Sequence, residues 1–228
     1  MLPSSLQARQ RPSLKYLALK RLIGLGIASF VIVALLKLPH QETYQNPEFG
    51  TNLPPLVMQG GDPYIRALMR TISASEANDS RPYSILYGGQ HVENLSRHPE
   101  KCVTIVNGPN KGNCSTAAGR YQLLNKTWYS VAQRYHPQPS GFLFWKSYSF
   151  QAEYQDRVVY AWLSDRTAWG TDISALLRQG KLDAVLRRLS STWTSLGYGI
   201  EDNSITGRLP QVYQTMLQQE LQKAGERS

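Results

Sequence analysis

The feature that most constrains this chain is a short amphipathic helix that ends in a glutamate. Asp62 and Pro63 form a helix start, because an aspartate caps free amide groups and a proline fits the first helical position. Apolar residues then recur three or four positions apart on one face: Ile65, Leu68, Met69 and Ile72. Glu76 continues this face, and the turn-forming residues 78–82 follow it. The pattern predicts a helix over about 62–76 with a carboxylate at its C-terminal end.

The position of Glu76 has two interpretations. A glutamate on a core-facing stripe beside a turn is partly desolvated, which disfavours the charged form and raises the carboxyl pKa. A carboxyl that stays protonated near neutral pH can serve as the general acid in glycoside cleavage. A glutamate that simply finds a partner at a helix end is the more common case. The helix alone does not decide between them.

The basic charge of the chain is concentrated at its N-terminus. Residues 1–38 hold six of the 25 basic residues and none of the 16 acidic ones, so the formal charge of +9 leaves only +3 for the remainder. No stripe of Lys and Arg interleaved with aromatic residues stands out, so nucleic acid is not favoured as a partner. A mildly basic domain fits an anionic polymer as substrate, although an ordinary solvated surface is the commoner meaning.

An uncharged apolar run over residues 22–36 predicts a membrane anchor. With its flanking leucines the run approaches the roughly 20 residues that cross a bilayer. A cleaved signal peptide is the alternative, but residues 37–39 (Lys-Leu-Pro) form a poor cleavage site. Because the basic side stays in the cytoplasm, the remainder is expected outside the cytoplasmic membrane.

The predicted organisation therefore has four parts. They are a basic cytoplasmic tail (1–21), a transmembrane anchor (22–38), a Pro-, Gly- and Gln-containing linker (39–61) and one globular domain (62–228). The sequence of the domain predicts a helix, then a small β region and then several further helices, an order typical of the α+β class. Its β region comprises a strand-like run over 83–87 and a second over 103–106, before a loop at 107–113.

Cysteine and histidine usage argues for a disulfide and against a metal site. Cys102 and Cys114 are an even pair on the exported side, which favours a disulfide at the base of a β-hairpin. The histidines do not have the spacing of zinc ligands: His40, His91, His98 and His136. No metal or other cofactor is predicted.

Helical periodicity continues to the C-terminal end. Shared apolar faces run through Tyr121–Tyr135, Phe150–Trp162, Leu182–Leu189 and Val212–Leu217. The Gly-aromatic segment 193–199 is either a connector or a cleft wall, with Tyr198 offering a ring and a hydroxyl to a sugar.

Several ordered motifs resemble the phage lambda lysozyme family of lytic transglycosylases, which has a lysozyme-like fold. The resemblance covers about residues 63–225. Its motifs are Ser75-Glu76, Pro82-Tyr83 with Gly88-Gly89, His98-Pro99-Glu100-Lys101, Ala118-Gly119-Arg120-Tyr121-Gln122-Leu123-Leu124, Ser-x-Trp193-x-Ser-Leu196 and Gly197-Tyr198-Gly199. Any one motif would be weak, but their order and spacing together favour a catalytic Glu76.

The resemblance implies roles for particular residues. Glu76 would be the single catalytic carboxylate, and the substrate-binding residues would be Tyr83, Ser84, Gln122 and Tyr198. Residues 102–116 and 194–207 match two lips over a cleft. Ser84 stands where the phage enzyme has an aspartate, which weakens a two-carboxylate mechanism. The cysteine pair and the membrane anchor are further departures.

The sequence therefore predicts a membrane-anchored lytic murein transglycosylase that acts on peptidoglycan glycan strands and leaves 1,6-anhydromuramic ends. Two alternatives remain open. One is a hydrolytic muramidase with the same cleft, and the other is a non-catalytic glycan-binding scaffold. A glutamate in a cleft argues against the scaffold, because desolvation of a partly buried carboxylate lowers the stability of the protein unless the residue has a function.

Overall fold

The structure is a computed structural model and describes residues 53–141, 146–198 and 206–225. Its helices are α2 (Pro63–Glu76), α3 (Asn125–Tyr135), α4 (Ala152–Ser164), α5 (Arg166–Trp169), α6 (Ile173–Arg178), α7 (Leu182–Leu189) and α8 (Leu209–Gly225). Short 3-10 turns are η1 (Pro82–Ser84), η2 (Thr194–Leu196) and η3 (Thr206–Arg208). The strands β1 (Val103–Thr104) and β2 (Cys114–Ser115) pair antiparallel. The predicted mostly helical α+β class with a small hairpin is confirmed.

The predicted membrane anchor at 22–38 lies outside the described residues. Within the described ranges, no helix is long and apolar enough to cross a bilayer.

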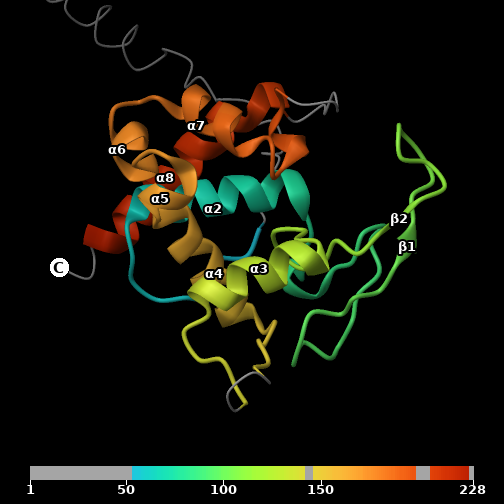
Figure 1. Cartoon of the computed structure of the whole chain (residues 1–228). Helices are drawn as coiled ribbons and strands as arrows, with labels where there is room; N and C mark the ends of the chain where they lie inside the picture. The colour runs from blue at the N-terminus through green and yellow to red at the C-terminus, as the bar shows by residue number, and fades with distance from the viewer. Residues whose placement is uncertain (1–52, 142–145, 199–205, 226–228) are drawn as a thin grey trace, which may run out of the picture. The chain divides into compact units, whose positions relative to one another are not determined.

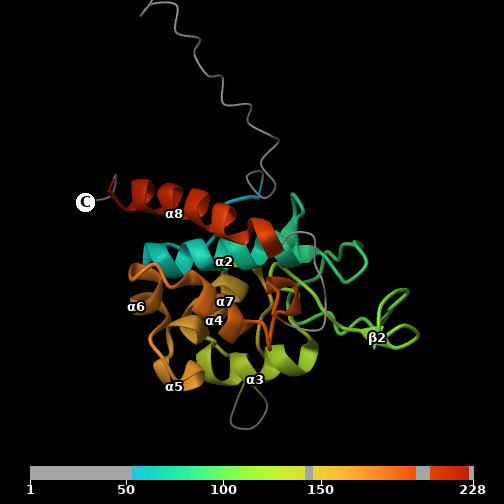
Figure 2. The ribbon, with the colours of Figure 1, turned by 90° about the horizontal axis from the view of Figure 1, so that it is seen from above.

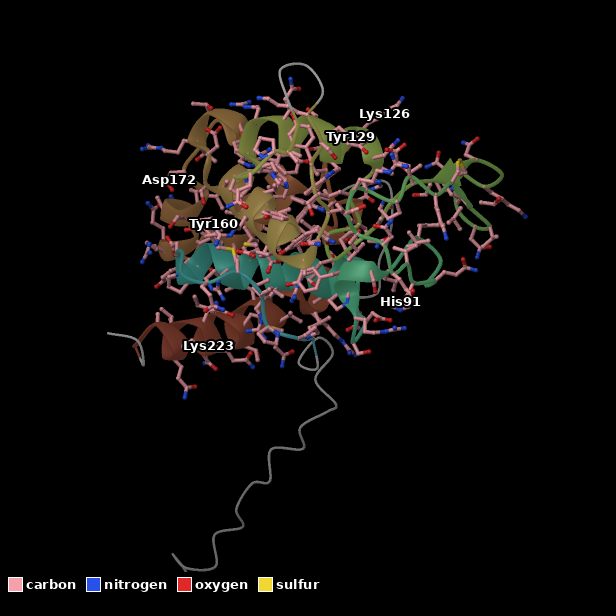
Figure 3. The ribbon with its side chains drawn as sticks, turned by 90° about the horizontal axis from the view of Figure 1, so that it is seen from below. His91, Lys126, Tyr129, Tyr160, Asp172 and Lys223 are labelled. Carbon is pink, nitrogen blue, oxygen red and sulfur yellow. A yellow bond between two sulfur atoms is a disulfide. The ribbon has the colours of Figure 1, made fainter. Side chains whose placement is uncertain are left out.

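Helix α2 is the central element, and it forms as predicted. The Asp62 side chain accepts a hydrogen bond from the Tyr64 amide at 2.8 Å, and Pro63 occupies the first turn. The predicted apolar face is at most 1% exposed at all four of its positions. Figure 2 shows α8 along one side of α2, with α7, α4 and α3 on the other. Figure 3 shows Tyr160 of α4 beside α2, where its hydroxyl accepts from the Asp62 amide at 2.7 Å.

A buried ion cluster joins α2 to α8. The Glu220 carboxylate accepts from Arg66 Nε at 2.7 Å and from Arg70 Nη1 at 3.1 Å. All three residues are at most 7% exposed. Two buried cations on α2 thus share one carboxylate of α8 as their counter-charge, and this fixes how the two helices lie against each other.

The described end of the predicted linker packs against the domain. Leu53, Leu56 and Met58 are only 4–6% exposed and belong to the core. Asp156 of α4 accepts from the amides of residues 57 and 58, and Arg120 donates to the carbonyls of residues 54 and 55. Proline and glutamine made this stretch look like a spacer, but its apolar residues and backbone groups find partners on the domain. Residues 53–61 are therefore a strap and not a free spacer.

Two local predictions were wrong. The strand expected over 83–87 begins as the turn η1, because Pro82 fixes a turn conformation, and only single β-bridges follow at Ile85 and Leu86. The helix expected from about residue 121 begins at Asn125. The preceding residues form a turn in which Gln122 has φ of 42°, a value that a helix does not allow.

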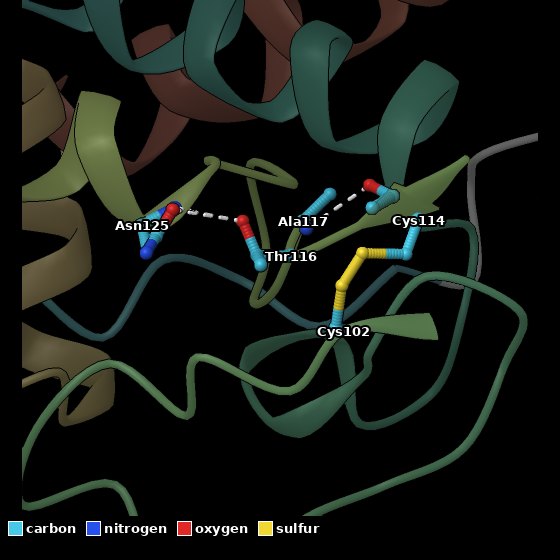
Figure 4. Close-up of a disulfide and its surroundings, with 6 residues drawn as sticks. Cys102, Cys114, Thr116, Ala117 and Asn125 are labelled. Atoms are coloured by element: carbon cyan, nitrogen blue, oxygen red, sulfur yellow. Dashed lines mark hydrogen bonds between the residues drawn. A yellow bond between two sulfur atoms is a disulfide. The ribbon is translucent and has the colours of Figure 1, made fainter. Parts of the chain in front are cut away.

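The β-hairpin projects from the helical body (Figure 1) and is closed as predicted. Val103 pairs with Ser115 and Thr104 with Cys114. A disulfide joins Cys102 to Cys114, whose Cα atoms are 5.3 Å apart, at the base of the hairpin (Figure 4). The Thr116 hydroxyl donates to Asn125 Oδ1 at 3.0 Å, so the hairpin is also tied to the start of α3.

Candidate active site

Glu76 is the last residue of α2 and is half-buried. The helix stops there because the Ala77 amide closes the last turn on the Ser73 carbonyl at 2.8 Å and residue 77 leaves the helical conformation. This end of α2 lies on the side of the molecule from which the hairpin projects (Figures 1 and 2). A carboxylate is thus held on a rigid element at the edge of the core, as the sequence predicted.

Ser195 of η2 is the direct partner of this carboxylate. Its hydroxyl donates to Glu76 Oε1, and its oxygen lies 2.6 Å from Ser75 Oγ. The sequence motif Trp193-x-Ser-Leu196 contained Ser195, but the residue was not predicted to be part of the site. It lies 119 positions from Glu76, and no local pattern pairs residues so far apart.

The turn at residues 119–123 is the second component of the site. Gly119 has φ of 74°, and a Cβ there would lie 2.8 Å from the Phe150 ring and would also collide with the Gln155 amide. Gln155 Oε1 instead accepts from the Arg120 amide at 2.9 Å. Only glycine fits this close approach of the turn to α4.

Backbone contacts bring this turn to its neighbours. The Gly119 amide donates to the Ile85 carbonyl at 2.8 Å, and the Gln122 side chain donates to the same carbonyl at 3.3 Å. The Trp193 indole donates to the Tyr121 carbonyl at 2.9 Å. The end of α2, residues 82–86, the turn and residues 193–197 therefore meet in one region. Gln122 lies within it, and its substrate-binding role stays a prediction.

The Tyr83 hydroxyl points into the interior of the protein. It donates to Asp156 Oδ2 at 2.8 Å and accepts from Arg120 Nη1 at 2.9 Å. Burial and the neighbouring Asp156 carboxylate raise the pKa of Tyr83, and burial raises the pKa of Asp156. The Tyr83 hydroxyl therefore supports the strap, and the Arg120 guanidinium lies 5.1 Å from the centre of its ring. Tyr83 also lines a cavity of about 590 Å³ between residues 54–59 and 80–84, and its contact with substrate stays a prediction.

Ser84 belongs to a small polar chain. Its hydroxyl lies 2.8 Å from His91 Nδ1, and His91 Nε2 lies 3.4 Å from Asp79 Oδ2. His91 is on the hairpin side of the molecule (Figure 3). No local sequence pattern connects these residues, because His91 and Asp79 come from two separate loops. Ser84 also lines the same cavity as Tyr83, and its contact with substrate stays a prediction.

Tyr198 is 46% exposed, but α7 side chains already engage it. Its hydroxyl donates to Asp183, and the Arg187 guanidinium lies 4.3 Å from the centre of its ring. A sugar that used this ring would have to displace Arg187 or bind the opposite face. Its predicted contact with substrate is untested.

The comparison with solved structures defines the fold class. The bacteriophage lambda lysozyme, solved in complex with a chitohexasaccharide, matches with a TM-score of 0.51 and 24% sequence identity. The match covers 70% of this chain and 97% of that chain. The fold is therefore lysozyme-like, with the glutamate-bearing helix α2 at its centre.

The sequence comparisons give the family. The endolysin family model matches residues 66–220, and the endolysin of Escherichia phage lambda is 30% identical over 144 residues. That alignment covers 59% of this chain and 79% of the phage protein. The chain belongs to the endolysin family, and it is a lysozyme-like peptidoglycan glycosidase.

Proposed function

We propose that the chain is a membrane-anchored lytic murein transglycosylase. It cleaves the β-1,4 bond between N-acetylmuramic acid and N-acetylglucosamine and leaves 1,6-anhydromuramic ends. The bound chitohexasaccharide of the lambda lysozyme, an N-acetyl sugar chain, supports a glycan strand as the substrate. Membership of the endolysin family supports the cleavage of peptidoglycan.

The observation that carries this proposal is the placement of the Glu76 carboxylate at the end of α2, where that helix meets the 119–123 turn and residues 193–197. Glu76 is fixed at the end of α2 by the Ser195 hydroxyl. Position 84, the nearest candidate for a second carboxylate, is a serine whose hydroxyl is bonded to His91. Retaining and inverting hydrolases generally use two carboxylates. One carboxylate suits a reaction in which the same residue acts first as acid and then as base.

The proposed reaction proceeds in two steps. Glu76 gives its proton to the glycosidic oxygen, the C1–O bond breaks, and positive charge develops at the muramic acid C1. The acetamido oxygen of the same sugar is available to stabilise that charge. The ionised Glu76 then takes the proton of the C6 hydroxyl as that oxygen bonds to C1. The enzyme ends protonated as it began, and no water is consumed.

Replacement of Glu76 by glutamine tests the catalytic assignment. Glutamine keeps the shape but can neither give nor take the proton, so turnover of peptidoglycan should fall by about 100-fold or more. Binding to glycan strands should survive. Glu153→Gln is the matched control, because Glu153 lies on the surface of α4 in an exposed pair with Arg157 and should keep full activity. Near-normal turnover by Glu76→Gln would refute the assignment.

The membrane anchor is the second part of the proposal. It rests on the apolar run 22–36, the basic residues before it and the poor cleavage junction after it. Full-length protein should stay in the membrane fraction after a carbonate wash, and a chain lacking residues 1–39 should become soluble. Recovery of a mature chain that starts near residue 40 would instead establish a signal peptide.

A further inference from the structure

The catalytic carboxylate is one end of a chain of two serine hydroxyls. Ser195 Oγ donates to Glu76 Oε1, and a hydroxyl has only one hydrogen to donate. In the 2.6 Å contact between Ser75 Oγ and Ser195 Oγ, Ser75 must therefore be the donor. The alternative acceptor for Ser75, the Ile72 carbonyl, is more distant at 3.4 Å. The hydrogen bonds thus run from Ser75 to Ser195 to Glu76.

Ser195 is held rigidly enough to orient a carboxylate. It is 8% exposed, and its neighbours Trp193 and Leu196 are at most 2% exposed. The Trp193 indole is bonded to the Tyr121 carbonyl, which anchors the segment to the 119–123 turn. A donor that is fixed before the reaction does not have to reorganise during it.

The geometry points to Ser195 as a positioning residue that determines which oxygen of Glu76 carries the catalytic proton, with Ser75 acting through it. Because Oε1 of Glu76 accepts the hydrogen of the Ser195 hydroxyl, the proton of neutral Glu76 resides on Oε2. When Glu76 gives up this proton, the same hydroxyl stabilises the charge that develops on the carboxylate. Ser75 strengthens the Ser195 donor, because hydrogen bonds in a chain polarise one another.

This inference rests on the proposed role of Glu76, and it adds two residues that act on the chemical step. Loss of the hydrogen bond from Ser195 to the charged Glu76 carboxylate should lower kcat by about 10- to 100-fold. The apparent KM should stay within about twofold, because Ser195 acts on the carboxyl group and not on ground-state binding.

The test measures kcat and KM on peptidoglycan sacculi for Ser195→Ala, Ser75→Ala and the double variant. We expect a large loss of kcat in Ser195→Ala and a smaller loss in Ser75→Ala. The double variant should equal Ser195→Ala alone, since Ser75 has no route to Glu76 once the Ser195 hydroxyl is gone. Ser195→Thr retains the hydroxyl and should recover most of kcat.

Ser190→Ala is the matched control. Ser190 is buried to a similar extent, at 7% exposed, but its hydroxyl donates to the Arg187 carbonyl. It should keep wild-type kcat, and thermal melting identifies any variant that has lost its fold.

Two results would overturn the inference. One is wild-type kcat in a folded Ser195→Ala, and the other is a strictly additive loss in the double variant. If Glu76→Gln is inactive in the same assay, either result removes only the hydroxyl chain. Activity of Glu76→Gln would remove the proposed function itself.

Discussion

At the residue scale, His98 connects the loop before the hairpin to the turn that carries Gln122. The His98 Nδ1 atom accepts from the Glu100 amide at 3.1 Å, so Nε2 carries the hydrogen and donates to the Leu123 carbonyl at 2.9 Å. The ring is 1% exposed and packs edge-on against Phe150. Burial lowers the pKa of His98, so the ring is neutral in the folded protein at pH 7.

This lowered pKa makes stability depend on pH. As pH falls below about 6.5, the unfolded chain binds a proton at His98 before the folded protein does. The free energy of unfolding should therefore be fully retained above that pH and should fall as pH drops toward the folded-state pKa of His98. Urea denaturation at pH 7.5 and pH 5 measures the difference. His98→Gln, which cannot take up that proton, should show a weaker dependence between the two pH values.

The role of His98 is checked by comparing how steeply the free energy of unfolding changes with pH in the wild type and in His98→Gln. His136 is also buried with a lowered pKa, so part of the pH dependence should persist in His98→Gln. An unchanged dependence in that variant would show that His98 does not contribute.

Residue-level predictions from sequence succeeded where the signal was local. The position of Glu76 at a helix end could be predicted because that helix has a clear apolar period, and the disulfide because its two cysteines are close in sequence. The catalytic role of Glu76 rests on the resemblance of several motifs and stays a prediction. Ser195, Arg120 and Asp156 were not predicted as a site or a support. Each acts through a contact between distant segments, such as Asp156 with the amides of residues 57 and 58. Chain periodicity carries no information about such contacts.

At the element scale, the packing of α2 against α8 depends on Glu220. Glu220→Gln keeps the side-chain volume but leaves Arg66 and Arg70 buried without a counter-charge. Breaking a buried pair in this way should lower the free energy of unfolding by about 3 kcal/mol or more. Glu153→Gln, which removes an exposed pair four residues apart on α4, should cost less than about 0.5 kcal/mol. Equal effects in chemical denaturation would contradict the assigned role of the ion cluster.

The longer helices could be predicted from sequence and the shorter ones could not. The periods in 62–76 and 182–189 correspond closely to α2 and α7. Helices α5 and α6 were not predicted, because their four and six residues are too few to display an amphipathic period. Proline at position 82 and the positive φ at Gln122 explain the two misplaced elements.

At the scale of the whole molecule, the strap is the main departure from the predicted organisation. Residues 53–61 were expected to be linker, but buried Arg120 and Asp156 hold their backbone against the domain. The Tyr83 hydroxyl joins both of these side chains, so the strap is connected to the segment that carries Ser84. The order of motifs along the chain predicted the lysozyme-like architecture correctly, whereas composition did not indicate that residues 53–61 pack on the domain.

The most direct test of the central claim is the mass of the muropeptides released from peptidoglycan by the wild-type chain. If Glu76 acts alone as acid and then as base, the C6 hydroxyl attacks in place of water. The products should then be lighter by one water than hydrolytic products and should end in 1,6-anhydromuramic acid. Products that end only in reducing muramic acid would contradict this mechanism and make the chain a hydrolytic muramidase.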